Sequence, residues 1–145
     1  MKRKISIVFF LLTFVFVLLI STFFIPQVRG VLQGAPFLFL FALIFLFGLL
    51  LLIFSLKFQK KGLLKKFLIL TGISPLVMVG GSVLHNFVYG IFIFFFGSDF
   101  WDKIGTGDEP FFFFIAVVIA PLGFLTGLIG TLVILVKNRL KKQRE

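Results

Sequence analysis

The longest uncharged stretch of this sequence, residues 67–97, reads FLILTGISPLVMVGGSVLHNFVYGIFIFFFG. As one straight helix it would be about 46 Å long, whereas the hydrocarbon core of a bilayer is about 30 Å thick. It is therefore more than long enough to cross a membrane. Three other hydrophobic segments accompany it, and it contains most of the polar residues found inside the four segments.

The composition places the chain among membrane proteins. Hydrophobic residues make up 60% of the sequence, against about 45–50% in soluble domains. Backbone groups in lipid must pair internally, so only helices or closed barrels span a bilayer, and the segments lack the alternation of barrel strands. We therefore predict an all-α integral membrane protein, a four-transmembrane-helix bundle forming a single domain over residues 1–145.

The segment boundaries follow from charges and prolines. We expect transmembrane helices at about residues 5–25, 37–56, 67–93 and 111–136, and a basic tail at 137–145 that frays. Pro26 should end the first helix, and Pro36 should lie in the first turn of the second. The long third helix should bend near Pro75 or Gly80-Gly81. A re-entrant hairpin at these two glycines is the alternative.

Basic residues indicate the orientation. Of 15 lysines and arginines, all but Arg29 and Lys103 lie at the N-terminus, in the middle loop or in the tail. The three groups are Lys2, Arg3 and Lys4; Lys57, Lys60, Lys61, Lys65 and Lys66; and Lys137, Arg139, Lys141, Lys142 and Arg144. Positive residues favour the cytoplasmic side, so we predict a multi-pass protein of the cytoplasmic membrane with both termini inside. A re-entrant hairpin would place the tail outside. The abundance of Phe, Ile and Lys fits AT-rich codons, and we expect a prokaryotic source.

The net charge of +10 also bears on partners. Its basic groups flank hydrophobic segments, so we expect them to meet anionic lipid head groups at the cytoplasmic face, and we expect no nucleic-acid partner. The absence of cysteine excludes disulfides, thiolate metal sites and cysteine nucleophiles. We expect no bound metal and no cofactor.

The fourth segment carries small residues at helical spacing: Ala116, Ala120, Gly123, Gly127 and Gly130. Such residues let helix backbones approach closely in lipid. The face would pack against the other helices of the same chain, or it would form the contact with a second copy or another membrane protein.

The third segment carries a polar cluster: Ser82, His85, Asn86 and Tyr89. Polar groups in a bilayer should face protein or water, so the cluster is either a site for a ligand, ion or proton or a set of interhelical hydrogen bonds. Pro121 leaves the carbonyl of Val117 without its usual donor. From the expected depth of His85, we predict that His85 or Asn86 packs near that kink.

The outer loop contains four acids: Asp99, Asp102, Asp108 and Glu109. They would form a cation site or bind a basic ligand, or they would lie in a solvated loop in which Asp108 or Glu109 stabilises the N-terminus of the last helix. We expect Phe100-Trp101 to lie in an aromatic belt at the outer surface.

Function is weakly specified. No charged residue lies within the predicted spans, although a proton-coupled pump usually needs one. We expect a non-enzymatic accessory, interaction or structural protein. The alternatives are a small oligomeric channel or transporter with a polar path along the third helix, and a membrane enzyme that uses His85 with Asp99 or Asp102.

Overall fold

All four hydrophobic segments form long helices. The computed structural model describes residues 2–144, apart from the side chains of residues 142 and 144, and this part contains helices and no strand. The long elements are α1 (Arg3–Phe24), α3 (Ala35–Phe58), α4 (Leu63–Phe96), and the consecutive α6 (Pro110–Phe114), η1 (Ile115–Ile119) and α7 (Ala120–Arg144). By length and hydropathy these are four helices able to cross a membrane. The predicted all-α, four-span fold class is confirmed.

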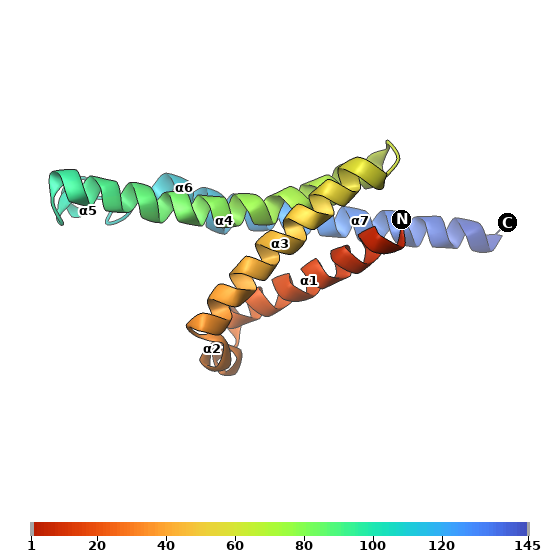
Figure 1. The fold of residues 1–145 in the computed structure, drawn as a ribbon, viewed down its shortest axis with the longest axis horizontal. Coiled ribbons are helices and arrows are strands. Elements are labelled where there is room, and N and C mark those ends of the chain that lie inside the picture. Colours follow the sequence, from red (N-terminus) through yellow and green to blue (C-terminus); the bar gives the residue numbers. More distant parts are fainter. Residues whose placement is uncertain (1, 145) are drawn as a thin grey trace.

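Helix α4 is the centre of the molecule. It packs against α7 and against α3, and α1 packs against α3. Figure 1 shows the α1–α3 hairpin crossing α4 near the end of the molecule where both termini lie and diverging from it toward α2. The core lies at this crossing, where the ring of Phe16 in α1 stacks on Phe124 of α7 with centroids 4.0 Å apart.

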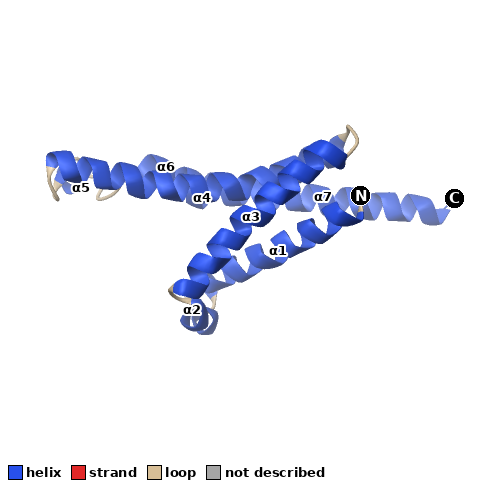
Figure 2. Ribbon diagram, viewed as in Figure 1, coloured by secondary structure: helices blue, strands red, loops and turns tan. Residues whose placement is uncertain are grey.

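The two ends of the molecule differ in charge. The termini and the α3–α4 loop lie together (Figure 1), and this basic end carries residues 2–4, 57–66 and 137–141. The opposite, acidic end contains the loop of residues 97–109 with the short helix α5 (Phe100–Lys103). Figure 2 shows that only short loops join the helices.

Helix α4 runs without interruption from Leu63 to Phe96, through Pro75 and both glycines at positions 80 and 81. This excludes the re-entrant hairpin. A second pair of glycines sets the point where α3 crosses it. A Cβ atom on Gly72 would lie 2.8 Å from the backbone nitrogen of Leu52, and one on Gly48 would lie 2.9 Å from the Pro75 Cβ. Small residues thus allow the two backbones to approach closely.

The disturbance expected at Pro121 takes the form of a π-helical turn. Proline lacks an N–H, and its ring crowds the carbonyl four residues earlier, which here belongs to Val117. Helix η1 ends at Ile119, two residues before Pro121, and the Ala120 N–H donates to the carbonyl of Ile115, five residues earlier. The wider turn makes room for the proline ring while the helix continues.

Two expected irregular segments are helical. The tail does not fray after Val136, because α7 extends to Arg144. Its lysines, arginines, leucine and glutamine are good helix formers, and cations interact favourably with a helix C-terminus. The connection at residues 27–35 contains the short helix α2 (Pro26–Leu32), which Pro26 begins at a position where its missing N–H costs nothing. Pro36 lies in the first turn of α3, as predicted.

Arg29, an isolated cation, caps the end of α1. Its Nε donates to the Thr22 carbonyl at 3.0 Å and its Nη2 to the Phe23 carbonyl at 2.9 Å. Because the last carbonyls of a helix lack intrahelical donors, we expect Arg29→Ala to lower the free energy of unfolding by about 1 kcal/mol. The loss would be measured by circular dichroism during denaturant titration in micelles. Lys60→Ala removes an exposed loop cation and should have no effect; equal losses would rule out a contribution from the cap.

Candidate functional site

The polar residues of α4 lead to a junction between α4 and the start of α6. His85 lies there with 15% of its side chain exposed. Its Nδ1 is 3.0 Å from the backbone carbonyl oxygen of Glu109 and 3.3 Å from Glu109 Oε2, and its Nε2 is 3.7 Å from Asp108 Oδ2. A carbonyl only accepts hydrogen bonds, so Nδ1 carries the proton and donates to it. Nε2 then faces the carboxylate of Asp108.

Glu109 is the most buried acid among the described residues, with 5% of its side chain exposed. It caps α6, since Oε1 accepts from the Phe111 N–H at 2.8 Å and Oε2 from the Phe112 N–H at 3.0 Å. A carboxylate at a helix N-terminus satisfies free N–H groups and interacts favourably with the helix dipole. Asp108 Oδ1 also accepts from the Glu109 N–H at 2.7 Å. The buried Glu109 carboxylate therefore accepts from two backbone N–H groups.

Aromatic rings extend the junction toward α5. Trp101 stacks on Tyr89 with centroids 5.9 Å apart and planes 10° apart, and its Nε1–H donates to the Tyr89 carbonyl at 3.3 Å. Tyr89 in turn lies 6.4 Å from the ring of His85. Trp101 is only 7% exposed, so its ring packs inside the protein, and its place in an aromatic belt stays a prediction. These contacts hold α5 against the end of α4.

Ser82 and Asn86 bond within their own helix. The Ser82 hydroxyl donates to the Met78 carbonyl at 2.9 Å, and the Asn86 amide donates to the Ser82 carbonyl at 2.8 Å. Of the four residues in the predicted polar cluster, His85 and Tyr89 therefore lie in the junction. Ser82 is half-buried, and Asn86 is exposed on the surface of α4.

The predicted pairing of His85 or Asn86 with the Pro121 kink is wrong. Pro121 instead lies beside Phe16 and Ser74, and His85 is level with Glu109. From the sequence we expected the fourth segment to begin level with the end of the third. Because the loop of residues 97–109 folds back along α4, the fourth helical segment begins nearer to the middle of that helix.

The small-residue face of the fourth segment packs against α4 within the chain. Ala116 lies opposite Gly81, and Ala120 is buried. A Cβ atom on Gly123 would lie 2.9 Å from Ser74 Oγ, and one on Gly127 would lie 2.7 Å from the Thr71 backbone nitrogen. At Gly130 it would meet the ring of Phe67. The intrachain contact thus occupies the whole predicted face.

The four acids in the loop of residues 97–109 do not converge. Asp99 pairs with Lys103 at 3.7 Å on the surface, Asp102 is exposed, and Asp108 and Glu109 turn to His85. Within residues 2–144, no group of three or more His, Cys, Asp or Glu side chains is placed to hold a metal ion. Asp99 and Asp102 are therefore not the partners that an enzymatic role for His85 was expected to use.

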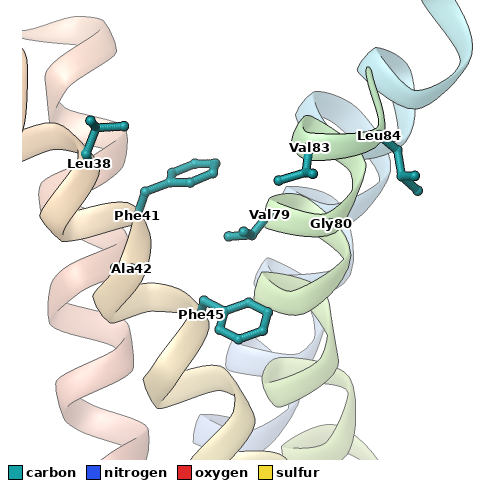
Figure 3. Close-up of a pocket in the computed structure, with 8 residues that line it drawn as sticks. All are labelled: Leu38, Phe41, Ala42, Phe45, Val79, Gly80, Val83 and Leu84. Carbon is teal, nitrogen blue, oxygen red and sulfur yellow. The ribbon is translucent and has the colours of Figure 1, made fainter. Parts of the chain in front are cut away.

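An apolar groove of about 680 Å³ opens where α3 diverges from α4 (Figure 3). The residues that line it are Leu38, Phe41, Ala42 and Phe45 from α3, and Val79, Gly80, Val83 and Leu84 from α4. No polar side chain is among them, so the groove provides nothing to orient a polar ligand.

Comparisons with protein-family models, with curated proteins and with solved structures found no match. The chemistry of the junction therefore has to be inferred from its own contacts. The geometry around Glu109 is that of a helix cap. The sequence indicated the cap, because an acid directly precedes Pro110. It held no signal for the pairing with His85.

Proposed function

We propose that this chain is a non-enzymatic accessory, interaction or structural protein of a cytoplasmic membrane. The observation that carries the proposal is that polar side chains along α4 are engaged inside the chain. Thr71 and Ser74 are 0% and 4% exposed, and their hydroxyls donate to the carbonyls of Phe67 and Leu70 at 2.8 and 2.7 Å. A transport path would require such groups to face water, whereas a packed bundle requires them to be paired.

The charge distribution supports a topology with both termini in the cytoplasm. The two terminal segments and the α3–α4 loop form the basic end (Figure 1). Positively charged segments are retained on the cytoplasmic side, and the same cations suit anionic lipid head groups. Arg29 lies at the other end of α1, but it caps that helix. Its position is therefore explained by the cap and does not count against this topology.

One observation favours a second candidate, an oligomeric channel or transporter. Asn86 is exposed on the outer half of α4, and an amide facing lipid is unfavourable unless a partner or water meets it. An interaction role would cover Asn86 with another membrane protein. A channel would hydrate it, so the two functions differ in the solvent around α4.

Cysteine accessibility along α4 tests the proposal, because the native chain has no cysteine. Single cysteines at positions 71–90 would be treated with a membrane-impermeant thiol reagent applied from each side. We expect protection at the paired or buried positions 71, 74, 78 and 82. Labelling at 78, 82, 85 and 89, with protection between them, would indicate a water-filled path and overturn the proposal.

Two exposed loop positions provide the controls. Lys60→Cys and Ser98→Cys lie in the loops at the basic and the acidic end, respectively. With the proposed topology, Lys60→Cys should react only from the cytoplasmic side and Ser98→Cys only from the outside. If Lys60→Cys reacted only from the outside and Ser98→Cys only from the cytoplasm, the proposed topology would be overturned. The accessibility pattern along α4 could still be interpreted, because it does not depend on which side is cytoplasmic.

A further inference from the structure

A cleft of about 440 Å³ separates α1 from α7 at the basic end. It exists because α1 packs mainly on α3 and α7 mainly on α4, so that the two helices are not closely packed on each other along their length. Ser6 and Phe10 line it from α1, and Leu132, Val136, Asn138 and Arg139 are among the residues that line it from α7. Its volume lies within the range of about 300–1,000 Å³ typical of ligand sites.

The lining changes from apolar to polar along the helix axes. Helix α1 begins at the basic end and α7 ends there, so Phe10 and Leu132 lie deepest, and Ser6, Asn138 and Arg139 lie nearest the membrane surface. The cleft thus has an apolar floor, formed by Phe10 and Leu132, beneath a polar opening. A phospholipid has the same arrangement, since its acyl chain lies deeper in the membrane than its head group. A soluble anion would bind only at the polar opening and would gain nothing from the apolar floor.

The charge at the opening favours an anion. Arg139 lines the cleft, and Lys2, Arg3 and Lys4 precede its α1 side in the sequence. All acids within residues 2–144 lie at positions 99–109, at the other end of the molecule. An arginine guanidinium donates two parallel hydrogen bonds to phosphate, and the Ser6 hydroxyl and Asn138 amide can add further donors.

We propose that this cleft binds one anionic phospholipid of the inner leaflet. Its acyl chain lies along Phe10, Leu132 and Val136, and its phosphate binds Arg139 at the opening. The assignment goes beyond the accessory function proposed above, and its choice of the inner leaflet rests on the topology proposed there. It predicts recognition of a specific lipid class at one place, rather than general attraction to a charged surface.

The test is lipid titration of the full-length protein in a neutral detergent, followed by native mass spectrometry. We expect dioleoyl phosphatidylglycerol to bind more tightly than dioleoyl phosphatidylcholine, with inorganic phosphate unable to displace it. Arg139→Gln should weaken the first phosphatidylglycerol by about tenfold, since it removes a charge-assisted contact to phosphate. Lys137→Gln removes an equal charge outside the cleft and should have a much smaller effect.

A second pair of variants tests the apolar floor. Val136→Trp should fill the cleft and weaken phosphatidylglycerol binding, whereas Val133→Trp should not. Both valines are exposed, at 56% and 59%, so neither change should disturb the fold. Equal effects of Arg139→Gln and Lys137→Gln, unchanged binding in Val136→Trp, or equal affinity for the two lipids would each overturn the proposal.

Discussion

Replacing Gly127 by alanine is expected to force α7 away from α4 and to lower the free energy of unfolding by about 1–3 kcal/mol. The new Cβ atom would lie 2.7 Å from the backbone nitrogen of Thr71 and 2.9 Å from the backbone carbonyl oxygen of Phe67. Backbone atoms cannot rotate aside as a side chain can. Relief therefore requires the two helices to separate along the contact that carries most of the small-residue face. Far-UV circular dichroism during titration of micelles with a denaturing detergent would measure the loss.

Gly80→Ala is the matched control for this change. A Cβ atom on Gly80 would meet nothing within 4 Å, so the substitution should leave stability unchanged or raise it by up to about 1 kcal/mol through helix propensity. If both alanine variants unfold at the same detergent fraction, α4 and α7 are not in the close contact described.

Replacing Glu109 by alanine is expected to lower the free energy of unfolding by about 2–3 kcal/mol, because it removes a helix cap and a buried charged acceptor together. The variant leaves the N–H groups of Phe111 and Phe112 without their side-chain acceptor, and it removes the carboxylate near His85 Nδ1. Hydrogen exchange at these two amides should accelerate more than exchange in the middle of α7. The same titration gives the global loss.

Two further variants separate the contributions. Glu109→Gln keeps an acceptor oxygen without the charge and should lose less than Glu109→Ala. Asp99→Ala removes an exposed acid paired with Lys103 and should cost about 0–0.5 kcal/mol, as surface ion pairs usually do. A loss in Glu109→Ala no larger than that in Asp99→Ala would contradict the buried role of Glu109.

Most of the fold could be predicted from the sequence because its determinants are local. Charge-free segments give the spans, Pro26 and Pro36 mark helix ends, and an acid before Pro110 gives the cap of α6. The small residues from Ala116 to Gly130 predict a packing face by their helical spacing, but the choice between α4 and a second copy as its partner needed the structure. The spans, helix ends and cap depend on hydropathy and backbone chemistry, and both can be read from the sequence alone.

The partner of His85 could not be predicted in the same way. It depends on how residues 97–109 fold back on α4, and that path is set by Trp101 stacking on Tyr89. Such a contact joins two elements and leaves no periodic pattern. The π-helical turn before Pro121 is similar, since a proline predicts a disturbance without specifying whether the helix bends, breaks or widens.

The stacking of Trp101 on Tyr89 also decides what spectroscopy can observe in this protein. The chain has one tryptophan, one tyrosine and one histidine, and all three lie in the junction of α4, α5 and α6. Intrinsic indole emission and imidazole resonances therefore report on that single place, far from the glycine-mediated crossing of α3 and α4. If the junction undocks before the bundle separates, fluorescence will register a transition while the bulk of the helical signal is still intact.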